Sequence, residues 1–399
     1  MTKKSGFGLL ALIGAFSTLG PFTVDPYLAS FPQIAVDLNS DIAGVQLSLS
    51  AFTLGFTIGF LLAGPISDAY GRRKPLIYGG IGYVVATVLL ALSTNIFLFQ
   101  LAKVGQGIAG AWIYVVGLAM VRDLYEGKKL FTAMGQLFLV AAASWVLAPS
   151  SGSFAILFTD WRGLALAIAV YGAILVLVAI KVLPETLHFE GKQKVDLASM
   201  LKGFKKVLSD RNYTGLVIVQ MVLSIAQFGY LAVLPLVYTE SFAVPAEQVG
   251  YWMALNSVAA YTGIQISTWL AKRFAPQWVL TAGLTMSLIV GSALVYAGVN
   301  HAPFAVVEAI TFAWLFCFGF QFTLLQTLAM ANHGSEAGTA SALLSAGGYV
   351  ATTVAGPYFT AIDRSTSLGY GSNILMAMGL GFMIYLIVVR PWAVKESSH

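Results

Sequence analysis

Two ionisable residues stand inside segments that are otherwise apolar. Asp25 closes the run GFGLLALIGAFSTLGPFTV and is followed at once by Pro26, and Lys103 lies in the run FLFQLAKVGQGIAGAW. Ionisable groups inside apolar spans are costly and are therefore candidates for function. A carboxyl binds and releases protons, and an ammonium, unlike a guanidinium, readily loses its proton when it is desolvated. We therefore expect Asp25 and Lys103 to act as proton-coupling residues.

Both residues fall in the outer half of the membrane, at similar depth. Asp25 is near the end of the first apolar span, and Lys103 is near the start of the fourth, which runs in the opposite direction. A charge pair at one depth offsets part of the cost of burying each group. The alternative for Lys103 is a side chain that reaches to the membrane surface. Pro21 and Pro26 interrupt the first span and free backbone carbonyls beside the acid.

The elements that must position these residues are membrane helices. Of the 399 residues 58% are hydrophobic and 10% are charged, whereas a soluble domain carries about 25% charged residues. Apolar segments that are long enough to cross a bilayer as helices recur along the chain. We expect twelve spans, at 7–29, 45–67, 75–94, 98–122, 131–156, 163–184, 213–238, 249–270, 276–297, 302–330, 337–361 and 369–390. The predicted class is an all-α integral membrane protein.

The basic residues predict the orientation of the spans. All lysines and arginines except Arg162, Arg364 and Lys103 fall on the same side as the two termini. The excess of basic residues in cytoplasmic loops makes that side the cytoplasm. The net charge of +5 therefore reflects topology and contact with anionic lipid rather than a nucleic-acid partner.

A long polar stretch, about 183–213, divides the spans six and six. Such a division is typical of transporters built from two similar halves. We expect a six-helix bundle over 1–184, a cytoplasmic linker over 185–212 and a second bundle over 213–399. The linker segment DLASMLKGFKKVL has helical apolar spacing with lysines on the opposite face, so we expect an amphipathic helix on the inner membrane surface; a plain solvated linker is an equal alternative.

The loop after the second span reads GPISDAYGRRKP. A glycine in a helix permits close packing, a glycine in a turn permits unusual backbone angles, and the acid and the arginines can pair. With the RD pair of MVRDLY these residues predict a charge cluster that latches the halves in the outward-open state, the alternative being that the charges only set topology. The members that we expect in this cluster are Asp68, Arg72, Arg122 and Asp123, and the loop adds Gly64, Gly71 and Arg73 to the gating residues.

The loop string resembles the signature between the second and third helices of the major facilitator superfamily. Lys103-x-x-Gln106-Gly107-x-x-Gly110 is similar to the second signature of that family, with lysine in place of the usual arginine. Ala148-Pro149-x-x-Gly152 resembles the third signature, that of the antiporter branch, and adds Pro149 and Gly152 to the gating residues.

The strings FTVDPYLASFP, VRDLY and GTASALLSAGGY most resemble the Bcr/CflA group of drug:proton antiporters, the exporters of the bicyclomycin- and chloramphenicol-resistance kind. The resemblance implies a multi-pass protein of the bacterial inner membrane that exports small lipophilic, neutral or singly charged drugs in exchange for protons. It also implies that an acid of the first helix, here Asp25, carries the proton. We expect no cofactor, no metal and a monomer.

Polar and aromatic side chains on the central parts of spans are candidates for the substrate pocket, which should be mostly apolar with a few polar anchors. These are Tyr114, Trp145, Gln227, Tyr230, Asn256 and Gln321. Efflux of a sugar or another metabolite is the alternative function, and an integral membrane enzyme lacks a recognisable catalytic dyad or metal cluster. Glu308, an acid just inside the tenth span, either has a role of its own or caps the helix at the outer edge.

Overall fold

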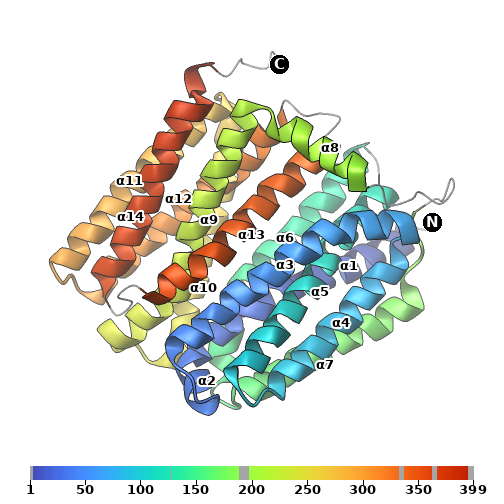
Figure 1. Cartoon of the computed structure of the whole chain (residues 1–399), viewed down its shortest axis with the longest axis horizontal. Coiled ribbons are helices and arrows are strands. Elements are labelled where there is room, and N and C mark those ends of the chain that lie inside the picture. Colours follow the sequence, from blue (N-terminus) through green and yellow to red (C-terminus); the bar gives the residue numbers. More distant parts are fainter. Residues whose placement is uncertain (1–2, 126, 188–196, 332–336, 362–365, 394–399) are drawn as a thin grey trace. The chain divides into compact units, whose positions relative to one another are not determined.

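The protein is helical in every part of the chain that the structure, a computed structural model, describes: residues 3–125, 127–187, 197–331, 337–361 and 366–393 (Figure 1). Within those residues nine helical segments are long and apolar enough to cross a membrane. This confirms the all-helical character and the membrane class. The middle of the predicted linker, 188–196, and Arg364 lie outside the described residues.

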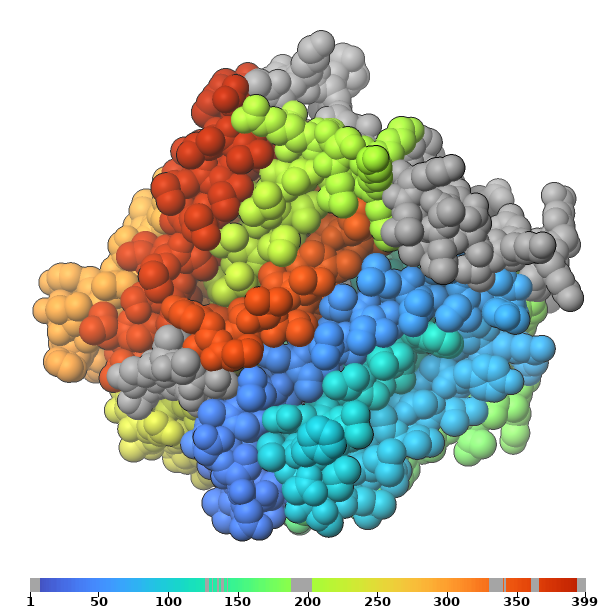
Figure 2. All heavy atoms as spheres, in the orientation of Figure 1, coloured from blue at the N-terminus to red at the C-terminus, as the bar shows by residue number. Residues whose placement is uncertain are grey.

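The chain divides into two compact units, 1–196 and 197–399. In the first unit α3 packs along α5, α4 packs on α5 and α7, and α1 packs on α6. The close packing of α3 (blue) against α5 (teal) is visible with all atoms drawn in Figure 2. The elements of this unit are α1 (Lys3–Val24), η1 (Asp25–Ser30), α2 (Phe31–Asp37), α3 (Ile42–Tyr70), α4 (Arg73–Ala91), α5 (Ile96–Leu124), α6 (Gly127–Ala155) and α7 (Trp161–Val182).

The second unit repeats the same internal pairing. Here α10 packs along α12, α11 packs on α12 and α14, and α9 packs on α13. Its elements are α8 (Leu197–Leu208), α9 (Arg211–Leu236), η2 (Val237–Ser241), α10 (Ala246–Ala271), α11 (Pro276–Val299), α12 (Phe304–Ala331), α13 (Ala337–Ala361), α14 (Ser367–Ile384), η4 (Tyr385–Val389) and η5 (Pro391–Ala393). By position in this pairing α9 corresponds to α1, α10 to α3 and α12 to α5.

Glycines let the paired helices approach closely. A Cβ atom at Gly55 or Gly59 of α3 would collide with the backbone of α5, and one at Gly263 or Gly319 would collide across the α10–α12 contact. Without a hydrophobic driving force between helices in lipid, such small residues allow the backbone contact that holds membrane helices together. Glycines at the contact therefore allow the close packing of α3 on α5 in one unit and of α10 on α12 in the other.

Two short helices lie outside the twelve expected spans. α2 follows the break at the end of α1, between the first two expected spans. α8 forms within the predicted amphipathic segment, and it buries Val207 while Lys205 and Lys206 are exposed. That distribution is the one expected of a helix with one apolar and one basic face.

Candidate functional site

Asp25 stands at the break of the first helix. α1 ends at Val24, and Asp25 and Pro26 open the 3-10 turn η1. Pro26 lacks a backbone N–H, so the α-helical hydrogen bonding cannot continue through it. The Asp25 side chain is partly exposed, and among the described residues it makes no hydrogen bond or ion pair. A carboxyl in this situation is free to exchange a proton.

Lys103 is buried, with 3% of its surface exposed, and it reaches the same break from α5. Its Nζ donates a hydrogen bond to the carbonyl oxygen of Thr23 over 2.6 Å. The ammonium also lies 4.2 Å from the centre of the Tyr27 ring. Thr23 O belongs to the last four carbonyls of α1, which have no partner within the helix, so Lys103 satisfies a backbone group that the break has freed.

The expected pairing of Asp25 with Lys103 is therefore corrected. The ammonium contacts residues on either side of the acid, Thr23 and Tyr27, and forms no ion pair with the acid itself. Its burial also excludes the alternative of a side chain that extends to the membrane surface. The sequence predicts that the interrupted helix frees backbone carbonyls beside the acid, but not that Lys103 binds one of them, the carbonyl oxygen of Thr23.

Other buried polar side chains brace the same region from α4 and α5. The Tyr83 hydroxyl is 2.6 Å from the Thr23 hydroxyl and 3.1 Å from the Leu19 carbonyl oxygen, to which it donates. Gln106 donates to Thr87 Oγ1 over 2.9 Å, so it ties α5 to α4. These bonds fix the end of α1 relative to α4 and α5.

One of the two predicted gating residues of α6, Gly152, also meets the break. Pro149 lies inside α6 and is buried. A Cβ atom at Gly152 would collide with the backbone of Pro26, so α6 contacts η1 at the residue directly after Asp25. Of the two glycines after Gln106, Gly107 needs its lack of side chain because a Cβ would meet the backbone of Phe52, whereas a Cβ at Gly110 would make only ordinary contact.

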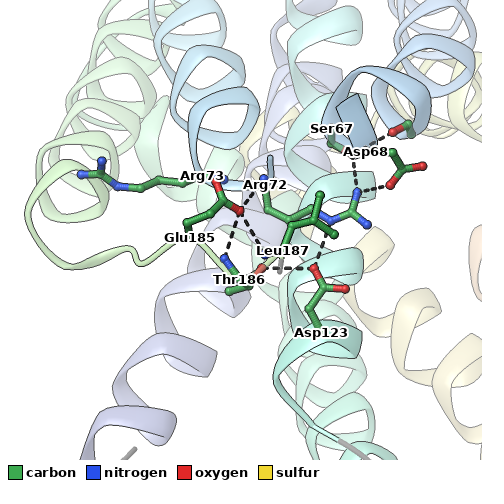
Figure 3. Close-up of polar contacts among 9 residues, drawn as sticks. Ser67, Asp68, Arg72, Arg73, Asp123, Glu185, Thr186 and Leu187 are labelled. Carbon is green, nitrogen blue, oxygen red and sulfur yellow. Dashed lines mark hydrogen bonds and ion pairs between the residues drawn. The ribbon is translucent and has the colours of Figure 1, made fainter. Parts of the chain in front are cut away.

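A second polar cluster, drawn in Figure 3, joins the ends of α3, α5 and α7 (Figure 3). Arg72 pairs with Asp68 over 2.5 Å and with Asp123 over 3.0 Å, and its Nη1 donates to Ser67 over 2.7 Å. The Arg72 side chain is largely buried, and a guanidinium that holds two carboxylates fixes their geometry. The structure thus brings together Asp68, Arg72 and Asp123, as the sequence predicts.

Glu185 completes this cluster and was missed in the sequence. Its carboxylate accepts backbone N–H bonds from Arg72 at 2.8 Å and Arg73 at 3.2 Å, and from Thr186 and Leu187 just after it. α4 has no side-chain cap of its own at Arg72, so Glu185 caps that helix from another segment. Burial acts to raise the pKa of Glu185, but the four amide donors, Arg72 foremost, hold that pKa below its usual value.

Arg73 makes the reverse contact. Its guanidinium donates to the carbonyl oxygens of Leu183 at 2.7 Å and Ile180 at 2.8 Å, at the end of α7. Cationic side chains at a helix C-terminus satisfy its last carbonyls and complement its dipole. A signal for this arrangement exists in the sequence, because the acid of LPET follows the sixth span on the same side as the GRRKP loop.

Two of the predicted gating residues, Arg122 and Gly64, do not make the contacts that we expect of them. Arg122 is exposed and forms no hydrogen bond or ion pair among the described residues. Gly64 was expected to permit close helix packing, but a Cβ there would have no neighbour within 4 Å. Gly71 does have the backbone its turn requires, with φ at 85°, and a Cβ at this position would collide with the Glu185 carboxylate.

The predicted pocket residues fall into two groups. Tyr114 and Trp145 are each 38% exposed, and the Tyr114 ring lies 6.5 Å from those of Phe56 and Phe60. Gln321 is buried and donates to the Gly283 carbonyl oxygen over 2.9 Å, so it joins α12 to α11 rather than facing an open pocket.

The other three pocket candidates lie in the second unit. Gln227 is partly exposed, but its Oε1 is buried without a hydrogen-bond partner. Tyr230 is buried against the ring of Trp314, 5.8 Å away between centroids. Asn256 donates to the Tyr238 hydroxyl. Glu308 neither caps nor extends at the membrane edge, because it is only 5% exposed and accepts a hydrogen bond from Tyr238.

Curated relatives of the chain are transporters. It is 29% identical over 386 residues to the uncharacterized MFS-type transporter YdgK of Bacillus subtilis, and the aligned region covers 96% of each chain. It is 26% identical over 293 residues to a bicyclomycin resistance protein homolog of Haemophilus influenzae, covering 73% of this chain and 74% of the relative. The multidrug resistance protein MdtL of Shewanella oneidensis is 26% identical over 336 residues, with 81% of each chain covered.

Solved structures share the fold at low sequence identity. The nucleoside transporter NupG superposes with a TM-score of 0.77 at 12% identity, over 96% of this chain and 100% of that one. A D-xylose-proton symporter superposes with a TM-score of 0.75 at 15% identity, over 94% and 97%. The model of the Major Facilitator Superfamily matches residues 8–357. The chain therefore belongs to the Major Facilitator Superfamily, as a multi-pass transporter of the bacterial inner membrane.

Proposed function

We propose that this transporter exports small lipophilic drugs in exchange for protons by alternating access. The observation that carries the proposal is the Asp25 carboxyl at the break between α1 and η1, which makes no hydrogen bond or ion pair within the part of the chain that the structure describes. The names of two relatives, a bicyclomycin resistance protein homolog and a multidrug resistance protein, support drugs as the substrate class.

In the proposed cycle Asp25 is ionised when the drug binds from the cytoplasm. After the transporter opens to the periplasm, a proton binds Asp25 and the drug leaves. The protonated carrier then returns and releases the proton inside. With one proton exchanged for a neutral drug, each cycle moves one charge down the membrane potential, which supplies about 2.3 kcal/mol per 100 mV.

The proposed topology has twelve spans with both termini in the cytoplasm. α6, α10 and α13 are long helices that add three spans to the nine candidates. The bundles at 1–184 and 213–399, joined by a linker at 185–212, form the two halves of a monomer. The basic residues that follow the positive-inside rule contact the anionic lipid of the inner leaflet.

We propose Tyr114 and Trp145 as substrate contacts, with Gln227 in the second unit. Within the first unit Tyr114 lines a cavity of about 20 Å³ together with Ser17 and Leu137, between α1, α5 and α6. Its lining is mostly apolar with hydroxyl groups as anchors, as expected of a surface that contacts a lipophilic molecule, and a drug would need the helices to separate there. Because the proposed drug exchange uses a single carboxyl, Asp25, neutral or singly charged drugs fit better than dications.

The test is proton release on drug addition to the purified protein in weak buffer. We expect release from the wild type and none from Asp25→Asn. Undiminished release from the variant would move the proton site away from Asp25. The variants Lys103→Arg and Asp25→Asn together decide whether Lys103 exchanges a proton of its own, because a guanidinium stays protonated.

Export of a sugar or another metabolite is the second candidate, since the structural neighbours include a D-xylose-proton symporter and a nucleoside transporter. Cells that lack the transporter would then accumulate a metabolite without becoming drug-sensitive. Drug resistance restored by the wild-type chain but not by Asp25→Asn, with unchanged metabolite levels, would set this candidate aside.

A further inference from the structure

The second unit contains a buried acid that the proposed cycle does not use. Glu308, the fifth residue of α12, is 5% exposed and lies within a candidate membrane span. In the part of the chain that the structure describes, no lysine, arginine or histidine forms an ion pair with it. An ionised carboxylate without a counter-charge is strongly disfavoured at such a position.

A chain of hydrogen bonds runs from Asn256 through the Tyr238 hydroxyl to the Glu308 carboxyl. The Tyr238 hydroxyl of η2 donates to Glu308 Oε2, and Asn256 Nδ2 of α10 donates to the same hydroxyl over 3.3 Å. Asn256 is fully buried and also lies within hydrogen-bonding reach of Glu308 itself. One oxygen of the carboxyl is therefore held by a neutral donor, and three elements of the unit meet at it.

The other carboxyl oxygen has no partner. Glu308 Oε1 and Asn256 Oδ1 are buried atoms without a hydrogen bond, whereas the Thr311 and Tyr370 hydroxyls lie within hydrogen-bonding reach of each other. At least nineteen-twentieths of the surface of each of these side chains is buried. Thr311 lies three residues after Glu308, on the same face of α12. A buried carboxyl oxygen without a partner is uncommon in native proteins and requires an explanation.

The groups that face Glu308 are neutral. Tyr238 from η2 and Tyr370 from α14 are the titratable neighbours, and Tyr230 of α9 interacts electrostatically with Tyr238. Asn256 and Thr311 supply an amide and a hydroxyl. Any charge that Glu308 carries must therefore be neutralised by something that enters from outside.

The position of this cluster repeats that of the Asp25 region. In the first unit Lys103 of α5 contacts the irregular segment that follows α1. In the second unit Glu308 of α12 contacts η2, the π-helical segment that follows α9. Because α12 and α9 correspond to α5 and α1 in the shared pairing, both units place a buried ionisable side chain against an interrupted helix.

We propose that Glu308 is a second proton-binding site of this transporter. A proton from solvent binds at Oε1 and leaves the carboxyl neutral, while Tyr238 keeps its hydrogen bond to Oε2. The new O–H finds acceptors in the buried oxygens of Asn256 and Thr311. A metal cation is a poorer occupant, because the Tyr238 hydroxyl already directs its hydrogen at the carboxyl and, among the described residues, no group of three or more His, Cys, Asp or Glu side chains could hold a metal ion.

The consequence for transport rests on the exchange proposed above. If Asp25 and Glu308 both give up their protons during a cycle, the exported drug is exchanged for one proton more than Asp25 alone provides. The variant Glu308→Gln, which keeps the shape and stays neutral, is expected to transport with one proton fewer per drug. Reversal potentials measured in proteoliposomes report that stoichiometry.

The direct test is infrared difference spectroscopy of the full-length purified protein, without drug, between acidic and alkaline buffer. Protonated carboxyl groups give a carbonyl-stretch band, and we expect one component of it to vanish in Glu308→Gln and to persist in Asp25→Asn. Tyr238→Phe removes the hydrogen bond to Oε2, so the same component should shift in frequency. A spectrum of Glu308→Gln identical to that of the wild type would overturn the proposal.

Two further outcomes are decisive. Loss of the wild-type component on addition of sodium at constant pH would identify a metal site instead. Should Glu308→Gln fail to fold, the frequency shift in Tyr238→Phe carries the test, since that change alters one hydroxyl only. Because no drug is present, a missing Glu308 band leaves the drug exchange standing, and a missing drug-induced proton release leaves the Glu308 site standing.

Discussion

The cap that Glu185 places on α4 gives a prediction with a magnitude. Glu185→Ala removes two charge-assisted hydrogen bonds to the N–H groups of Arg72 and Arg73. Loss of a helix N-cap costs about 1 kcal/mol, and loss of a negative charge near a helix N-terminus costs about 0.3–1 kcal/mol more. The side chain is exposed, so solvent screens the charge and the lower part of that range applies.

The assay is hydrogen exchange at the amides of Arg72 and Arg73, followed by mass spectrometry of the peptide that contains them. A loss of about 1 kcal/mol raises the local opening constant about fivefold, and exchange should accelerate by that factor in Glu185→Ala. Glu185→Gln keeps one acceptor oxygen and should show a smaller increase. The control is Glu240→Gln, because the exposed carboxyl of Glu240 makes no hydrogen bond among the described residues.

The effect must also depend on pH in one direction. Amide donors hold the pKa of Glu185 below its usual value despite the opposing effect of burial, so the unfolded state binds more protons than the folded state does. The stabilisation is therefore complete above the unfolded pKa of about 4.3 and is lost as pH falls through the folded pKa. The ratio of variant to wild-type exchange should fall towards one in acid, and a ratio that stays constant with pH would refute the capping role.

Substitutions at three further positions test the Asp25 region and the cluster around Arg72. Gly71→Ala places a Cβ at a positive φ and against Glu185, and should lower stability by about 1–2 kcal/mol, measured as the thermal unfolding midpoint of the detergent-solubilised protein. Lys103→Met leaves the Thr23 carbonyl without its donor and should lower the free energy of unfolding by about 1.5–3 kcal/mol. Lys103→Arg keeps a donor and should retain most of the stability. Equal losses in both variants would argue against the carbonyl contact. Gly152→Ala forces α6 away from η1 at about 1–3 kcal/mol and should slow drug export in a vesicle assay without loss of folded protein, while unchanged export would show that the contact does not matter.

The sequence predicts the features that depend on local chemistry. The break at Asp25 follows from Pro26, and the turn at Gly71 follows from the lack of a side chain. The cluster around Arg72 follows from complementary charges at the ends of two spans. Each of these needs only the helical spacing and the side on which a loop lies, and both can be read along the chain.

The features that sequence reasoning missed depend on backbone groups. Lys103 binds a carbonyl oxygen of α1, and Glu185 binds N–H groups of α4. Prolines in the sequence indicate where backbone carbonyls are free, but every residue carries backbone groups, so composition and spacing do not indicate which side chain binds which of them. Charge complementarity then favours the wrong partner, and Asp25 was expected where Thr23 is found.

Interrupted helices also explain why opposite charges occupy corresponding places in the two units. The freed carbonyl of Thr23 can only accept a hydrogen bond, so the group that meets it must donate, and Lys103 does so. At the other interruption the group that points inward is the hydroxyl of Tyr238, which donates, and the residue that meets it is the acceptor Glu308. In lipid no water can substitute for either partner. The buried ionisable side chain at each interruption therefore matches the hydrogen-bonding group that it meets: the donor Lys103 meets the Thr23 carbonyl, and the acceptor Glu308 meets the Tyr238 hydroxyl.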